Sequence, residues 1–269
     1  MTPTQICGRA RPRSKAIPCP QLAARRPEKL PPHCPTEPDP TRRNTLEEKG
    51  VPATMTTIGI IGSGRIGSNV AKAAVAAGYD VVLSNSRGPD TLGPLVHKLG
   101  PRASAAHPAE AAHRGDLVLV AVPLGKLDEI PADALAGKVV MDANNYYPQR
   151  DGRIAALDDN SKTTSQLLQD LAPSARVVKA FNNIYAAEIS EHGSPTGARD
   201  RRALPIAGDD SAAKHLVASF IDAIGFDTVD VGTLAESWKV ERDTPAYTQR
   251  TTREELEAIL PTVERVQQA

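Results

Sequence analysis

Short apolar runs alternate with longer amphipathic segments along residues 55–269. Several of the runs are hydrophobic at consecutive positions, which is typical of parallel strands covered by helices on both faces. The predicted strands are 58–61, 81–84, 117–122, 138–142, 176–181, 203–207 and 228–231. The predicted helices are 66–77, 90–99, 108–114, 163–171, 210–224 and 253–266.

This alternation predicts the fold class. Strands that are separated by helices form right-handed β–α–β crossovers, so we expect an α/β protein with a Rossmann-type, doubly wound, mostly parallel sheet. Gly78 and Gly225 stand where two of the helices should end, because glycine readily follows a helix C-terminus. The last predicted helix gives a short C-terminal helical extension, and its pattern leaves open whether it docks on the sheet or serves a homodimer.

Residues 1–54 differ in composition from the rest of the chain. They hold eleven prolines, all three cysteines, and ten basic against five acidic residues. Without a periodic apolar pattern they cannot offset the entropy of ordering, so we expect a disordered, basic, proline-rich segment. A second interpretation is that translation begins at Met55, two residues before the first strand. The expected parts are therefore 1–54, a Rossmann domain at 55–232, and the helical extension at 233–269.

Charge and composition exclude several functions. The whole chain has no formal net charge, and residues 55–269 carry 22 basic against 27 acidic residues, so a nucleic-acid partner is not expected. No run of about 18 apolar residues is present, so we expect no membrane partner and a cytoplasmic location. The histidines are scattered without metal-ligand spacing and the body has no cysteine, so no metal site is expected.

The first strand leads directly into a glycine-rich turn. Gly62, Gly64 and Gly67 form a G-x-G-x-x-G pattern between strand 58–61 and the following helix. In dinucleotide-binding sites the first glycine allows a sharp turn, the second admits the pyrophosphate, and the third lets the helix pack on the strand. The helix N-terminus also attracts phosphate. The motif therefore predicts a dinucleotide site.

The end of the second strand indicates which dinucleotide binds. Sites that prefer NAD usually carry a carboxylate there, but this strand ends in Ser84-Asn85-Ser86-Arg87. Arg87 can form charge-assisted bonds to a 2′-phosphate, and Ser86 can donate another. We therefore predict NADP(H) rather than NAD(H). Arg87 can alternatively be a solvated loop residue, and Asn85 can be either a ligand or a turn residue.

Further candidates follow the later strands. Ala121, Val122 and Pro123 end the strand 117–122, where the strands of a doubly wound sheet line the ligand crevice. Pro123 would brace the nicotinamide side, unless it only stops the strand.

Two amide-rich segments, 142–147 and 181–185, are expected at the same edge of the sheet. Their amides can orient a carboxamide or a planar substrate, so we assign Asn144 to the cofactor and Asn182 to the substrate side. Asp142 can instead be a turn acid and the tyrosines can be packing residues. Trp238 is the only tryptophan, and it either stacks on a flat ring on the substrate side or caps the core.

No proton-transfer group is recognisable in the sequence. A Tyr-x-x-x-Lys motif is absent at Tyr185, because Ile189 stands four positions later. No catalytic residue is assigned. Hydride transfer between two bound rings depends on positioning more than on acid–base groups, so the sequence remains consistent with such a reaction.

Taken in order, these motifs resemble the NADP oxidoreductases dependent on coenzyme F420. The resemblance covers about residues 56–247. It is carried by 62–67, Ser86-Arg87, Val122-Pro123, 207–210 with Ala213-Lys214, and 229–234. It implies direct hydride transfer between NADPH and the deazaflavin, with the 2′-phosphate held by Ser86 and Arg87. It also implies dinucleotide contacts from Ser63, Arg65 and Ile66.

The sequence departs from the family pattern at loops 144–147 and 181–184, and 88–91 stands where the family often has a basic residue.

From the motifs and the resemblance together, we predict an NADPH-dependent oxidoreductase that passes hydride between NADP(H) and F420 or a similar small-molecule hydride acceptor. Reduction of a flavin, a quinone or a small imine or carbonyl substrate stays open. So does a non-catalytic NADP(H)-binding sensor.

Overall fold

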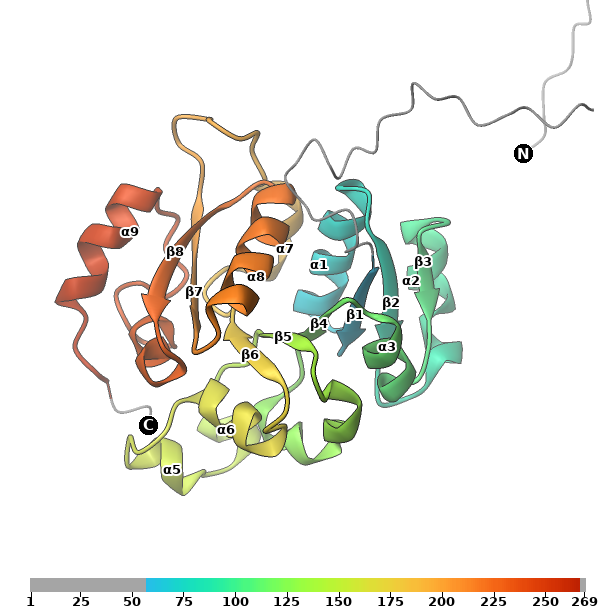
Figure 1. The fold of residues 1–269 in the computed structure, drawn as a ribbon, viewed down its shortest axis with the longest axis horizontal. Helices are drawn as coiled ribbons and strands as arrows, with labels where there is room; N and C mark the ends of the chain where they lie inside the picture. Colours follow the sequence, from blue (N-terminus) through green and yellow to red (C-terminus); the bar gives the residue numbers. More distant parts are fainter. Residues whose placement is uncertain (1–56, 267–269) are drawn as a thin grey trace, which may run out of the picture. The chain divides into compact units, whose positions relative to one another are not determined.

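The computed structural model describes residues 57–266, so the expectations for residues 1–54 and for a start at Met55 lie outside it. Within the described range, one sheet has the strand order β3-β2-β1-β4-β5-β6-β7-β8 (Figure 1). The strands are β1 (Thr57–Ile61), β2 (Asp80–Ser84), β3 (Ala103–Ala105), β4 (Leu117–Val120), β5 (Val139–Asp142), β6 (Arg176–Lys179), β7 (Ala203–Gly208) and β8 (Asp227–Gly232).

Helices connect these strands. The α-helices are α1 (Arg65–Ala76), α2 (Gly93–Leu99), α3 (Pro108–Arg114), α4 (Pro148–Asp151), α5 (Ala155–Asp158), α6 (Thr164–Leu171), α7 (Ala186–Glu191), α8 (Ser211–Ala223) and α9 (Arg253–Ile259). The 3₁₀ segments are η2 (Pro89–Leu92), η3 (Leu124–Glu129), η4 (Ala132–Leu135), η5 (Leu234–Val240) and η6 (Leu260–Thr262).

The sheet has the strand directions of a Rossmann fold. Strands β1 to β6 run parallel, with β1 between β2 and β4. Strand β7 is antiparallel to β6, and β8 is parallel to β7. The order therefore reverses at β1 and β4, where open α/β sheets bind their ligands at the carboxyl ends of the strands. The predicted doubly wound, mostly parallel α/β fold is confirmed.

Apolar side chains cover both faces of the sheet. On one face, residues of α1, α7 and α8 pack against β1, β2, β6 and β7. On the other face, residues of α3, η4 and α6 pack against β4, β5 and β6. Burial on both sides explains why the strands are hydrophobic at consecutive positions. On the face covered by α1, α7 and α8, the Phe220 ring packs in a T-shaped arrangement against two other rings. The ring centroids are 5.2 Å apart for Tyr79 and 6.1 Å apart for Phe181.

Several element boundaries differ from the prediction. Strand β3 was not predicted, because it has only three residues, and helix α7 was not predicted either. The segment 90–99 divides into η2 and α2, and strands β4 and β6 end two residues early. The last helix ends at Ile259 rather than at 266, because Pro261 has no backbone N–H and clashes with the preceding turn.

The residues after β8 pack against the sheet. Leu256 of α9 lies in one apolar cluster with Val229 and Val231 of β8 and with Val240 of η5. Helix α9 therefore docks on β7 and β8. None of the helices within residues 57–266 has the length and apolar content needed to cross a bilayer.

Replacement of Phe220 tests the aromatic packing beneath β6. Phe220→Ala removes a fully buried ring that contacts two others. We expect the free energy of unfolding to fall by about 3–5 kcal/mol, measured by urea denaturation followed by circular dichroism. The control His215→Ala lies on the exposed face of the same helix and should change stability by less than about 0.5 kcal/mol. A loss at Phe220 no larger than at His215 would contradict this packing.

Candidate functional site

A cleft of about 610 Å³ opens at the carboxyl ends of β1, β2 and β4. Its lining joins three segments that lie far apart in the sequence: the glycine turn, the loop after β2 and the turn after β4. The predicted cofactor residues that line it are Gly62, Ser63, Gly64, Asn85, Ser86, Arg87, Ala121, Val122 and Pro123. The structure thus brings these three predicted motifs together in one place.

Two of the three motif glycines are required by the fold itself. Gly62 has a φ of +101°, and a Cβ there would lie 2.3 Å from the Ala121 carbonyl oxygen. A Cβ on Gly67 would lie 2.0 Å from the carbonyl oxygen of Gly62. Neither position therefore accepts a side chain: at Gly62 the turn after β4 and the positive φ exclude one, and at Gly67 the close packing of α1 on the end of β1 excludes one.

Gly64 is different, because a Cβ there would meet no atom within 4 Å. It is exposed, it lines the cleft, and it is the N-cap of α1 with no side-chain capping bond. The first N–H groups of this twelve-residue helix are therefore left without a capping side chain. A pyrophosphate fits this arrangement, since it accepts from such N–H groups and needs a bare backbone.

The other predicted residues of this turn lie behind the cleft lining. Arg65 is exposed in the first turn of α1, and its carbonyl oxygen accepts from the side chains of Ser68 and Asn69. The Ile66 side chain packs against the core under β1. Only backbone groups of Ile66 and Gly67 are therefore available toward a ligand.

Hydrogen bonds fix the glycine turn to the end of β2. The Ser63 hydroxyl donates to the Ser84 carbonyl at 2.8 Å, and the Ser84 hydroxyl donates to the Ile60 carbonyl at 2.8 Å. The Gly62 N–H also donates to the Ser84 carbonyl. These bonds set the glycine turn and the loop that begins at Asn85 at a fixed spacing.

The loop after β2 presents a hydroxyl and a cation to the cleft. The Asn85 Oδ1 accepts from the Arg87 N–H at 2.9 Å, and its Nδ2 donates to Thr91 Oγ1 at 2.9 Å. Asn85 therefore shapes the turn, in line with the turn alternative, although it also lines the cleft. Ser86 and Arg87 are exposed, and no carboxylate of residues 57–266 forms an ion pair with Arg87. This guanidinium is available for a phosphate.

Asn144 joins the end of β5 to the turn after β4. Its side-chain Oδ1 accepts from the Val122 N–H at 3.0 Å. Asn144 is only 2% exposed, and its Nδ2 has no hydrogen-bond partner. A buried amide donor without a partner is costly and calls for an explanation. A ligand carboxamide is a suitable partner, so the residues present here fit the nicotinamide end of a dinucleotide.

The sequence analysis missed Lys126 and Glu129, which line the cleft beyond Pro123. Lys126 Nζ lies 2.5 Å from Glu129 Oε1. The hydrogen bond to Glu129 raises the pKa of Lys126, so the side chain is cationic at neutral pH. A lysine on a polar turn resembles a solvated residue in sequence. The sequence did offer one signal for Lys126: it follows closely after Pro123, which ends a strand at the ligand edge of the sheet.

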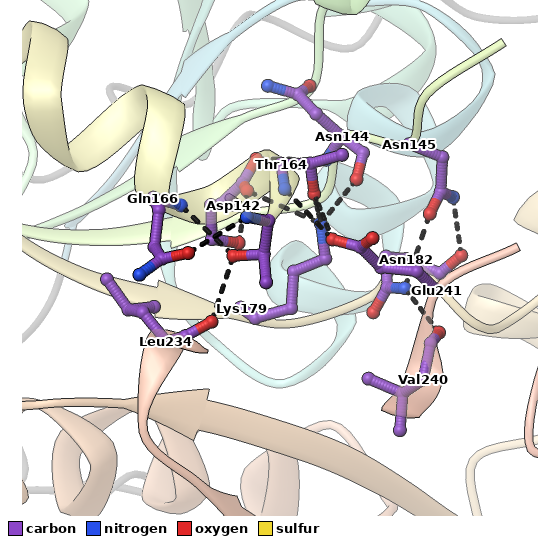
Figure 2. Close-up of polar contacts among 12 residues, drawn as sticks. Asp142, Asn144, Asn145, Thr164, Gln166, Lys179, Asn182, Leu234, Val240 and Glu241 are labelled. Carbon is purple, nitrogen blue, oxygen red and sulfur yellow. Dashed lines mark hydrogen bonds and ion pairs between the residues drawn. The ribbon is translucent and has the colours of Figure 1, made fainter. Parts of the chain in front are cut away.

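A buried polar layer, also missed, lies below this edge of the sheet (Figure 2). Lys179 and Asp142 are register partners at the ends of β6 and β5, and both side chains are fully buried. Thr164 and Ser165 of α6 form hydrogen bonds with Lys179 and Asp142, respectively. Thr164 also donates to Glu241, just after η5. In the sequence, Lys179 stands inside an apolar run and therefore resembles a strand residue that happens to be polar.

Asn182, which was predicted to lie on the substrate side, connects two other segments of the chain through hydrogen bonds (Figure 2). Its Nδ2 donates to the Val240 carbonyl at 2.7 Å, and its own carbonyl accepts from Asn145 Nδ2 at 2.7 Å. The preceding Phe181 is buried with a φ of +61°, an uncommon conformation for a bulky residue that costs free energy. Asn182 is only 3% exposed, so it holds these segments together from the interior of the protein.

Aromatic rings lie near these loops. The hydroxyls of Tyr147 and Tyr247 are 2.8 Å apart, and the guanidinium groups of Arg150 and Arg242 lie over the Tyr147 ring at 4.8 and 5.2 Å. Burial raises the pKa of Tyr247, so this phenol stays protonated. Tyr185 is 60% exposed.

Trp238 lies elsewhere. It is half-buried on η5, and the Arg265 guanidinium stands 5.8 Å from its ring. It lines a small pocket with Leu157 and Lys162. It is not among the residues that line the cleft. The structure therefore does not bring Trp238 to the dinucleotide cleft.

Several known proteins are similar to this chain in sequence and in fold. Residues 57–146 match the family of NADP oxidoreductases described as coenzyme F420-dependent. The metalloreductase STEAP3 of Rattus norvegicus is 33% identical over 194 residues, which are 71% of this chain and 37% of that protein. The chain spans less than half the length of the curated relatives that it matches.

Two solved structures are similar to this chain in sequence and in fold. The hypothetical protein SMa0349 of Sinorhizobium meliloti is 32% identical, with a TM-score of 0.63, over 74% of this chain and 96% of that chain. A protein of Arthrobacter sp. FB24, proposed to be an F420-dependent NADP reductase, is 26% identical with a TM-score of 0.57, over 67% of this chain and 86% of that chain.

The match covers β1, the glycine turn, the loop after β2 and the residues up to Tyr146, which include most of the cleft. The family description names NADP as the cofactor, in agreement with the cation and the missing carboxylate after β2. Residues 57–146 therefore match the coenzyme F420-dependent family of NADP oxidoreductases, and the chain shares its Rossmann sheet with a solved structure proposed to be an F420-dependent NADP reductase.

Proposed function

We propose that this protein transfers a hydride between NADP(H) and a deazaflavin of the F420 type or a similar small acceptor. One observation carries the proposal: the cleft at the ends of β1, β2 and β4 combines an uncapped helix N-terminus with an exposed cation. Behind its lining residue Val122 lies the buried side chain of Asn144, which accepts from the Val122 N–H and has an unpartnered amide donor. These features suit the pyrophosphate, the 2′-phosphate and the carboxamide of NADP(H). When bound, the nicotinamide supplies or accepts the hydride.

In this proposal the glycine turn holds the pyrophosphate. The N–H groups at the start of α1 donate to it, and Gly64 leaves the space that it needs. Ser63 contributes by fixing the turn to Ser84. Because these groups are held by the fold before any ligand arrives, binding requires little reorganisation of the protein.

Ser86 and Arg87 hold the 2′-phosphate in the proposal. Asn85 bonds the Arg87 N–H and so fixes the loop, while the Arg87 guanidinium extends into the cleft. No aspartate or glutamate follows β2 at 84–88, so nothing repels a phosphate there or selects the ribose diol of NAD. The loop thus favours NADP(H) through charge.

Asn144 and the turn after β4 orient the nicotinamide. The Asn144 Nδ2 donates to the carboxamide, while Val122 and Pro123 form the wall against which the ring rests. Hydride transfer depends on such positioning, since no proton needs to move between the two ring carbons. The acceptor then lies toward Asn182 and the exposed ring of Tyr185.

The relative that is named a metalloreductase favours a second candidate. In it, a flavin replaces the deazaflavin as the immediate hydride acceptor, and the reduced flavin passes its two electrons singly to two chelated metal ions. Within residues 57–266, no three His, Cys, Asp or Glu side chains form a group that could hold a metal ion. A metal ion would therefore be a substrate in this candidate.

An acceptor screen tests the proposal. The purified chain is mixed with NADPH and F420, FMN, FAD, chelated iron(III) or no acceptor, and loss of NADPH absorbance is followed. Turnover with F420 alone supports the first proposal, and turnover with flavin or iron supports the second. Tight NADPH binding without turnover on any acceptor would overturn both and indicate a sensor.

Replacement of Arg87 tests the 2′-phosphate assignment. Arg87→Ala should weaken NADPH binding by about 1.5–3 kcal/mol, the usual contribution of a hydrogen bond to a charged group, and leave NADH binding nearly unchanged. Isothermal titration calorimetry gives both affinities. The control Arg102→Ala removes an exposed arginine that pairs with Asp80 at the other end of β2, and it should alter neither. Equal losses for NADPH and NADH at Arg87 would refute the assignment.

Replacement of Gly64 tests the pyrophosphate position. Gly64→Val should abolish NADPH binding in titration calorimetry and leave the melting temperature unchanged, because its side chain enters the cleft without touching the protein. Gly93→Val is the matched control, since a Cβ there also meets nothing within 4 Å. It lies outside the cleft lining, so it should bind NADPH normally. Normal affinity in Gly64→Val would place the pyrophosphate elsewhere.

A further inference from the structure

A fully buried lysine lies beneath the proposed nicotinamide site (Figure 2). Lys179 Nζ donates to the main-chain oxygen of Asn144 at 2.5 Å and to Thr164 Oγ1 at 2.6 Å, and it stands 3.4 Å from Asp142 Oδ2. Its aliphatic stem and its ammonium group are both inaccessible to water. The proposed function assigns no role to this buried ammonium group.

The charge is enclosed by groups that are themselves well bonded. Asp142 accepts from the Asn144 N–H at 3.0 Å and from the Ser165 hydroxyl at 2.6 Å. The Thr164 hydroxyl accepts from Lys179 and donates to Glu241 Oε1 at 2.7 Å. One cation thus lies between two buried carboxylates, and the hydrogen bonds satisfy the groups that burial deprives of water.

The two members of the ion pair act on the same residue. Asp142 holds the N–H of Asn144, and Lys179 holds its carbonyl oxygen. Both peptide groups that flank the Asn144 side chain are therefore fixed. From this fixed main chain the Asn144 side chain reaches Val122, with Oδ1 accepting from the Val122 N–H and Nδ2 unpartnered.

We propose that Lys179 is a positioning residue for the nicotinamide end of NADP(H), acting through Asn144. This inference rests on the proposed function. An apolar pair of similar volume would stabilise the core at least as well as a buried ion pair, but it would leave the Asn144 main chain unheld. Lys179 fixes the donor that receives the carboxamide, and it contacts neither the adenine nor the phosphate end.

The test compares two ligands on the full chain. NADP⁺ carries the nicotinamide, whereas 2′,5′-ADP carries only the adenine and the 2′-phosphate end. In titration calorimetry, Lys179→Met should weaken NADP⁺ by about tenfold, as expected for one lost hydrogen bond. It should leave 2′,5′-ADP within about twofold of the wild type, because no contact at that end changes.

Lys138→Met is the matched control. Lys138 also donates to two main-chain carbonyls, those of His113 and Gly115, but it does so at the amino edge of the sheet. This variant should leave the ratio of the two affinities unchanged. Asn144→Asp keeps the acceptor for Val122 and removes the Nδ2 donor, so it should reproduce the selective loss of NADP⁺ affinity.

The outcomes separate the inference from the proposed function. Equal weakening of both ligands by Lys179→Met, or no weakening of NADP⁺, would overturn the positioning role. A wild-type chain that binds neither ligand would overturn the proposed function itself. If Lys179→Met does not fold, the double variant Asp142→Asn/Lys179→Met removes both charges together, and the same selective loss is expected from it.

Discussion

The contact between helix α1 and the end of β1 constrains the whole cofactor half of the molecule. Gly67 stands so close to the Gly62 carbonyl that a side chain at Gly67 would collide with backbone, and a side chain at Gly62 would collide with the Ala121 carbonyl after β4. This closeness directs the first turn of α1 at the gap between β1 and β4, where the strand order reverses. The loop after β2 and the turn after β4 then line one cleft, because parallel strands end at the same edge.

The sequence was sufficient where local backbone demands determine the structure. The glycine pattern, the Ser86-Arg87 pair and the strand-ending Pro123 are short signals, and the structure places all three in the cleft. Strand β3 escaped prediction because three residues at a sheet edge carry no periodic signal. The end of α9 was overextended, although Pro261 was visible in the sequence and limits that helix.

Contacts between distant segments could not be read from the sequence. Lys179 sits in an apolar run and Asp142 at a strand end, and only the register of β5 with β6 makes them partners. The direction of Trp238 depends in the same way on how η5 packs near Arg265. Asn144 was predicted from its place after a strand, but its unpartnered amide became visible only in three dimensions. The acceptor side is built mainly from such long-range contacts, which explains why its chemistry is harder to predict.

The connection of Asn182 to the Val240 carbonyl has an evolutionary consequence. It joins the loop after β6 to a segment that follows the sheet's last strand. Residues 57–146, which the family match covers, hold the residues that line the cleft, whereas Asn182 and Val240 lie beyond them. Such a division lets one half diverge while the other is retained. Relatives with this fold can therefore share an electron donor and differ in what they reduce.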